Sequence, residues 1–195
     1  MSRKKYSRVR YTLDAGEITA LPSHELAAVL RAADELIMTG GRSLLTKILK
    51  GSRDKKLLTL NLDQSPMYGY YSHLTLADIQ KRVDWVILEG YLAIEYELSI
   101  PLLRYTTKGW AIERETFARE LFAGFDQLLA SGATDFDMLY LKDRARDMIM
   151  ILLDMIEESG DPKYIPVLEA WAAVDYKKVR QRIAQVIESL SQRQP

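Results

Sequence analysis

The sequence predicts a mainly α-helical fold that contains one small β-hairpin, and three features of residues 75–109 support this prediction. Over 75–89, apolar residues recur at three- and four-residue steps, which places them on one side of a helix. Gly90 follows, and glycine readily adopts the positive φ that ends a helix. Two short runs of β-favouring residues, 91–96 and 102–106, come next and lead into another helix. Helix, hairpin and helix in this order form the end of a winged helix-turn-helix, which is the fold class that we predict.

Three helices are expected before this segment. Ser23 is a suitable N-cap, and an apolar stripe continues from it to Met38. A second helix is expected over 42–50, with its apolar residues inward and its bases outward. Gly51–Ser52 breaks this helix, and a third, shorter helix is expected over 55–60.

The chain after the hairpin is expected to be helical throughout. A long amphipathic helix runs from Trp110 to about Gly132, and the polar segment 131–135 is the best candidate for a domain boundary. Beyond it, apolar periodicity predicts helices at 148–156, 165–171 and 179–190. We therefore divide the chain into a basic arm or short hairpin (1–22), a winged-helix domain (23–132) and a helical C-terminal region (136–195).

Composition narrows the possible classes of protein. The chain of 195 residues is 48% hydrophobic, which is enough for a sizeable core. It contains no Cys and only two His, so thiol chemistry and thiolate metal sites are excluded. No run of eighteen apolar residues is present, and no apolar segment follows the basic start, so neither a membrane span nor a secretory signal is expected. We expect a cytoplasmic protein.

The net charge of zero hides an uneven distribution. Residues 1–10 carry five bases and no acid, and residues 42–56 carry six bases and one acid. Residues 110–160 carry eleven acids and five bases. Because local fields attract a polyanion whatever the total charge, a nucleic-acid partner remains open.

Residues 44–109 resemble the RQC domain, the winged helix that follows the motor in RecQ-type DNA helicases. The matching residues are Leu44–Lys56 (LLTKILKGSRDKK), Tyr68-Gly69, Val83, Val86-Ile87, Gly90-Tyr91-Leu92 and Leu103–Gly109 (LRYTTKG). The chain as a whole resembles the small stand-alone "minor" RQC proteins, which carry this domain without a helicase. The sequence has no G-x-x-x-x-G-K-[ST] loop for a triphosphate, so ATP-driven unwinding by this chain alone is not expected.

The C-terminal region shows a second likeness. Gly160–Pro162, Ile165–Leu168, Val179-Arg180 and Ala184 resemble one HEAT-type helical hairpin. Such arrays bury a core by stacking several units, so a single hairpin is expected to dock on another surface.

The RQC resemblance implies duplex or fork DNA binding at Gly51-Ser52 and the residues after it. The residue types agree with this. Gly51 allows close approach of the backbone, Ser52 offers a hydroxyl and an N–H at a helix start, and Arg53, Lys55 and Lys56 add cations. The alternative is a capped and solvated helix start.

Further candidates for DNA contact flank this position. They are Arg42, Lys47 and Lys50 on the outward side of the preceding helix, and Tyr71, Ser72 and Thr75 before the next one. For the three bases, a solvated helix face is an equally good interpretation.

The helix at 75–89 is a poor candidate for reading bases. Its side opposite the core holds Asp78, Lys81, Trp85 and Glu89, whereas major-groove reading favours Arg, Asn and Gln. Trp85 and Lys81 are better explained as an interface, either with another protein or with the chain's own C-terminal helices. The hairpin tip at 97–101 is short and approached by acids, so we do not assign strand separation to it.

The leading hypothesis is a non-enzymatic DNA-binding protein without a cofactor, a metal or catalytic residues. The acids at 135, 137, 143 and 147 are better explained as a solvated face than as a metal site, because no histidine accompanies them. The alternative is an adaptor that holds a protein partner through the winged helix and the C-terminal helices. RNA binding also stays open.

Overall fold

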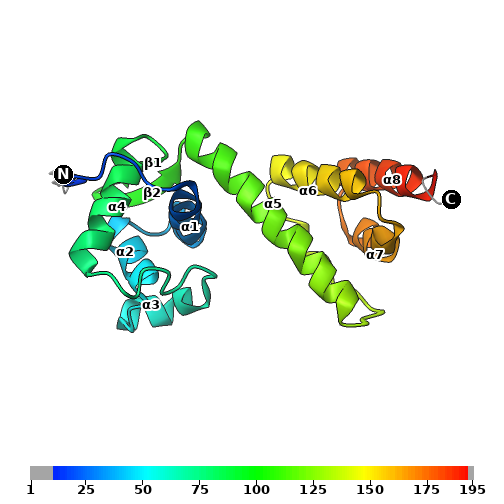
Figure 1. Cartoon of the computed structure of the whole chain (residues 1–195), viewed down its shortest axis with the longest axis horizontal. Helices are drawn as coiled ribbons and strands as arrows, with labels where there is room; N and C mark the ends of the chain where they lie inside the picture. The colour runs from blue at the N-terminus through cyan, green and yellow to red at the C-terminus, as the bar shows by residue number, and fades with distance from the viewer. Residues whose placement is uncertain (1–10, 193–195) are drawn as a thin grey trace, which may run out of the picture. The chain divides into compact units, whose positions relative to one another are not determined.

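The computed structural model describes residues 11–192, which fall into two units divided between Glu113 and Arg114. Figure 1 shows the elements of both units. No helix in the described part of the chain is both long and apolar enough to cross a membrane.

The first unit is a winged helix, which confirms the predicted fold class. Its helices and strands are α1 (Ser23–Ala33), η1 (Asp34–Leu36), α2 (Arg42–Lys50), α3 (Lys55–Thr59), η2 (Leu62–Gln64), α4 (Leu76–Leu88), β1 (Leu92–Glu97), β2 (Ile100–Tyr105) and the start of α5 (Thr107–Ala130). The two strands are antiparallel, in a register that runs from Leu92 opposite Tyr105 to Glu97 opposite Ile100. Ile37 pairs with Leu103 in a parallel bridge, so a short third segment joins the hairpin.

Local chemistry explains where the functionally important helices begin and end. Thr75 caps α4 by accepting the Asp78 N–H at 3.2 Å. Gly51 ends α2 at φ 74° and Gly90 follows α4 at φ 72°, conformations that cost other residues steric strain.

The core of the first unit lies where α1, α2 and α4 meet the hairpin. Leu30, Leu45, Ile48, Val83 and Leu103 are all fully buried there. Burial of one such side chain stabilises a fold by roughly 1.5–3 kcal/mol. This core holds α2 and α4 firmly, and α2 carries the candidate site at its C-terminal end.

Residues 11–22 contain no strand and lie against the helices of the first unit. The Asp14 N–H donates to Asp84 Oδ2 at 3.0 Å, and Arg42 donates to the Thr12 carbonyl at 3.3 Å. Residues 1–10, which carry the predicted basic arm, lie outside the described residues.

The second unit is helical. After the rest of α5 it contains η3 (Leu139–Leu141), α6 (Arg146–Ser159), η4 (Pro162–Tyr164), α7 (Ile165–Val174) and α8 (Lys177–Gln192). Helix α8 packs on both α6 and α7, as Figure 1 shows. Phe125, Leu152, Trp171, Ile183 and Val186 fill the space between the helices. The predicted break at 131–135 follows the end of α5, whereas the division between the units lies inside that helix.

Candidate nucleic-acid interface

The candidate site is the turn between α2 and α3, residues Gly51–Lys56, which we call the cationic junction. Its backbone is fixed by contacts with a distant loop. Gly69, at φ 76°, donates its N–H to the Ile48 carbonyl at 2.9 Å. A Cβ on Gly51 would lie 3.0 Å from the Gly69 Cα, so this close approach requires glycine at position 51. The Tyr68 hydroxyl donates to the Ser52 carbonyl at 3.1 Å and completes the brace.

Three cations of the cationic junction point into solvent. Arg53, Lys55 and Lys56 are exposed, and no salt bridge involves them within residues 11–192. Asp54 is the one acid of the junction. The junction is therefore cationic and exposed.

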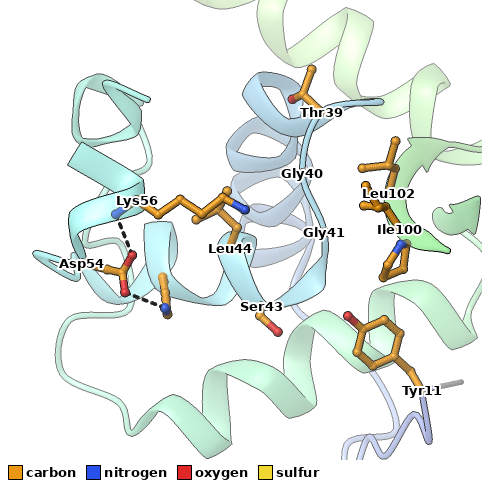
Figure 2. A pocket seen from close by; sticks show the side chains of 12 residues that line it. Tyr11, Thr39, Gly40, Gly41, Ser43, Leu44, Asp54, Lys56, Ile100 and Leu102 are labelled. Atoms are coloured by element: carbon orange, nitrogen blue, oxygen red, sulfur yellow. Dashed lines mark hydrogen bonds and ion pairs between the residues drawn. The ribbon is translucent and has the colours of Figure 1, made fainter. Parts of the chain in front are cut away.

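Asp54 organises the junction. Its Oδ2 pairs with Lys47 Nζ at 2.7 Å, and its Oδ1 accepts the Lys56 backbone N–H at 3.0 Å, which caps α3. The hydrogen bond from Lys47 holds the pKa of the Asp54 carboxyl below its ordinary value. Figure 2 shows these two interactions and the Lys56 side chain, which extends from α3 toward α2.

The predicted role of Ser52 as a backbone donor is wrong. Its N–H donates to the Lys47 carbonyl at 3.0 Å, and its hydroxyl oxygen accepts the Asp54 N–H at 3.3 Å. The start of α3 is also occupied by the Asp54 carboxylate. Only the hydroxyl hydrogen of Ser52 remains for a ligand, so the charged side chains must supply the contact.

Lys47 and Lys50 are half-buried and hold the structure together. Lys47 pairs with Asp54, as described above. Lys50 donates to the carbonyls of Ser72 and Leu74 at 2.6 and 2.7 Å, which ties α2 to the loop before α4. Both ammonium groups add to the positive field, and Ser72 is exposed beside Lys50.

The expectation that Arg42 faces outward is wrong. Its side chain is buried, with Nη1 3.2 Å from Asp84 Oδ1 on α4. Because α2 packs on α4, the first turn of α2 is covered by that helix and by residues 11–16. The isolated acid at 84, between apolar residues 83 and 85, was the sequence signal for a buried partner.

Tyr71 and Thr75 are also unavailable to a phosphate, contrary to expectation. Tyr71 is 2% exposed, and its hydroxyl donates to Glu25 Oε2 at 2.7 Å. The Thr75 hydroxyl caps α4 and donates to Asp78 Oδ2 at 2.6 Å. Tyr71 thus links the loop before α4 to α1, and Thr75 serves as the N-cap of α4.

Trp85 is not an exposed anchor, so the interface predicted for it is corrected. It is 8% exposed and stacks on Tyr91, with ring centroids 6.0 Å apart. The turn at Gly90 folds Tyr91 back over α4, which covers the helix face that we expected to be free. Lys81, on the same helix, is exposed.

The wing carries an apolar tip, which the sequence reasoning missed. Leu98, in the two-residue turn 98–99, is 69% exposed, and Ile100, which begins β2, is 58% exposed. The expected acids lie nearby, and Glu95 pairs with Arg104 at 3.2 Å. The sequence signal was the pair of apolar residues at positions 98 and 100. At the tight turn of a two-stranded hairpin, both side chains lack a second layer to pack against.

A cavity of about 290 Å³ connects the wing with the cationic junction. Lys47, Asp54 and Lys56 line one side of it, and Ile100, Pro101 and Leu102 line the other. Figure 2 shows Gly40, Gly41 and Ser43 between them. The site thus offers cations on one edge and apolar atoms on the opposite edge.

Nothing in the described part of the chain indicates a metal centre. No group of three or more His, Asp or Glu side chains is placed to hold a metal ion among residues 11–192.

Comparison with known proteins agrees with this geometry. A family model described as the RQC domain matches residues 22–121, a span that contains the complete winged helix. The ATP-dependent DNA helicase RecQ of Bacillus subtilis (strain 168) is 23% identical over 155 residues, which is 79% of this chain. The chain spans about a quarter (24%) of the length of that helicase. No solved structure shows a significant match. Because the family model covers just over half of the chain, this protein belongs to the RQC-domain family.

Proposed function

We propose that this chain is a non-enzymatic DNA-binding protein that contacts duplex or structured DNA mainly through the phosphate backbone. Three exposed cations, Arg53, Lys55 and Lys56, on a rigid junction carry this proposal. The family supports it, because the RQC domain of RecQ binds DNA and is itself non-catalytic. A cytoplasmic location forms part of the same proposal.

Rigidity favours binding at the cationic junction. Gly51, Gly69 and the Tyr68 hydrogen bond hold the backbone before the ligand arrives, so little conformational entropy is lost on binding. The three cations extend from this fixed backbone. Because phosphates repeat regularly along DNA, the cations can meet them on any sequence. Contacts of this kind position a protein without specifying a sequence.

The other surfaces of the winged helix support binding without base reading. The exposed face of α4 presents Lys81, Leu76 and Leu88 rather than a cluster of Arg, Asn or Gln. Arg42 is buried and therefore does not contribute a phosphate contact. We therefore expect about three phosphate contacts at the junction, which contribute about −3 to the slope of log K against log salt.

Fluorescence anisotropy across a salt series tests the proposal. The probes are a blunt duplex, a fork, a quadruplex and a single strand. The triple variant Arg53→Glu, Lys55→Glu and Lys56→Glu should weaken binding to every duplex sequence by more than about tenfold and flatten the salt slope. Lys81→Glu, an exposed change on α4, should have a much smaller effect. Binding that ignores salt would overturn contact through the phosphate backbone, and binding that survives the triple change would overturn the role of the cationic junction.

A protein adaptor is the second candidate, favoured by the apolar wing tip at Leu98 and Ile100. Large exposed apolar side chains on a protruding turn are typical of contact with another protein. The C-terminal helices, with their likeness to a HEAT hairpin, would supply a further surface. The double variant Leu98→Ser and Ile100→Ser should then abolish recovery of a partner in a pull-down and leave DNA affinity unchanged.

A further inference from the structure

The second unit contains a cavity of about 310 Å³ whose walls carry four cations. Lys142 and Arg144 come from the loop between η3 and α6, Arg146 is the first residue of α6, and Lys178 lies in the first turn of α8. Two segments that are well separated along the chain, residues 142–146 and the start of α8, therefore direct positive charge to one hollow.

The acids that line the same cavity are engaged with neutral groups. Asp175 is buried and accepts the Trp171 indole N–H at 2.7 Å and the Tyr176 backbone N–H at 2.6 Å. Asp143 accepts the Tyr176 hydroxyl at 3.2 Å. Neither carboxylate forms a salt bridge with a cation of the cavity within the part of the chain that the structure describes.

Two of the four cations contact aromatic rings and two are free, and none of the four is neutralised by an acid. Lys142 Nζ lies 5.2 Å from the centroid of the Tyr176 ring. The Arg144 guanidinium lies 4.8 Å from the Phe117 ring centroid, and its Nε donates to the Tyr140 carbonyl at 3.3 Å. Arg146 and Lys178 are exposed and form no salt bridge among residues 11–192. The cavity thus has a surplus of positive charge.

The positions of these cations oppose a local rule of helix stability. Cations are unfavourable at the first turn of a helix, because the helix dipole is positive there. Yet Arg146 begins α6, and Lys177 and Lys178 begin α8. The second unit as a whole has fourteen acids and eleven bases, so the excess of cations around this cavity does not follow from its composition. Residues that oppose local helix stability without stabilising the fold in another way tend to mark functional sites.

The start of α6 brings backbone N–H groups close to the same hollow. Ala145 supplies no side-chain cap to this 14-residue helix, and within its first turn the Met148 N–H is taken by Asp147 Oδ1 at 3.0 Å. Tyr176 is 57% exposed at the rim, where its ring offers a face to a sugar or base. A nucleic-acid phosphate that is followed by a sugar and a flat base matches this combination of cations and an exposed aromatic ring.

We propose that this cavity is a second phosphate-binding site, which takes a backbone phosphate of the nucleic acid bound by the protein. The proposal rests on the proposed function, because it assumes the same class of ligand. It assigns to the second unit a direct part in nucleic-acid binding, separate from the cationic junction.

The test compares two double variants of the full chain that change the net charge equally. Arg146→Gln with Lys178→Gln removes the two free cations of the cavity, whereas Arg119→Gln with Arg180→Gln removes two exposed cations of the second unit that do not line the cavity. Anisotropy is measured on a duplex and a single strand across a salt series, and circular dichroism checks the fold. The cavity variant should flatten the salt slope by about 2, and the control should stay close to wild type.

The outcomes separate this inference from the proposed function. If the wild type binds and the cavity variant matches the control, the second site is overturned while the junction stands. If the cavity variant weakens binding but the junction variant does not, the second site stands and the junction falls. If inorganic phosphate alone binds at the cavity and the DNA slope is unchanged, a free anion is the ligand and the inference is wrong. If the wild type binds no nucleic acid at low salt, both fall.

Discussion

The ammonium of Lys47 lies 2.7 Å from the carboxylate of Asp54, so the one acid of the cationic junction neutralises a cation of the preceding helix. The same carboxylate caps α3 through the Lys56 N–H. A single side chain therefore fixes the start of α3 and lowers the charge available to DNA. These two roles can be separated by substitution.

Asp54→Asn should raise DNA affinity without a large loss of stability. Asparagine caps a helix about as well as aspartate, so the start of α3 is retained. Lys47 then becomes a fourth cation for phosphate, and the log K against log salt slope should steepen by about 1. Asp54→Ala should also free Lys47 but destabilise the fold by about 1 kcal/mol through loss of the cap. An Asp54→Asn variant with weaker affinity than wild type would contradict this account.

Arg42→Ala should destabilise the first unit by about 3–5 kcal/mol, because it leaves the Asp84 carboxylate buried without its ion-pair partner. Replacement of both, as Arg42→Met with Asp84→Leu, should restore most of the loss. Urea denaturation measures the free energy of unfolding. At temperatures where the double variant is folded, its DNA affinity should equal that of wild type. A large drop in affinity would show that Arg42 takes part in DNA binding.

Gly51→Ala should cost more stability than Gly90→Ala. Both glycines have φ above 70°, so each substitution meets the strain of the left-handed region, roughly 1–2 kcal/mol. Only at Gly51 does the new Cβ also meet backbone, at 3.0 Å from the Gly69 Cα, whereas at Gly90 it meets open space. Urea denaturation of the two variants gives the difference directly. Equal losses would show that the Gly51–Gly69 approach is not what braces the junction.

Asp126 and Tyr164 should make the second unit sensitive to pH at both extremes. The Tyr164 hydroxyl donates to Asp126 at 2.6 Å, and Lys163 pairs with the same carboxylate at 3.0 Å. These bonds lower the pKa of Asp126, so its stabilising effect is present above about pH 4 and is lost as pH falls through its folded-state pKa. Burial and the Asp126 hydrogen bond raise the pKa of Tyr164 to about 12. Its contribution is therefore complete below about pH 10 and is lost as pH rises toward 12.

The comparison of wild type with Asp126→Asn and Tyr164→Phe across pH checks this. The difference in unfolding free energy between wild type and Asp126→Asn should shrink below pH 4. The difference between wild type and Tyr164→Phe should shrink above pH 10. Differences that stay constant across both ranges would contradict the assignment.

The exposure of the cationic junction could be predicted from the sequence because it depends on local chemistry. Gly51 ends α2, and Arg53, Lys55 and Lys56 follow before the next apolar residue, Leu57. Residues of this kind stay exposed in almost any arrangement of the helices. The predictions for Arg42, Tyr71 and Trp85 were wrong because each is buried by a distant segment or by one that folds back on it. Those for Ser52 and Thr75 were wrong because their polar atoms already have partners within the fold.

The sequence by itself determined the helices, the hairpin and the ends of α2 and α4, because apolar periodicity and glycine conformation act over a few neighbouring residues. The packing of α2 on α4 decided that Arg42 is a buried partner of Asp84 rather than a contact for DNA. The packing of α6 on α8 decided that Arg146 and Lys178 share a cavity. Periodicity states which residues share a helix face, but only the tertiary structure states which face a neighbouring element covers.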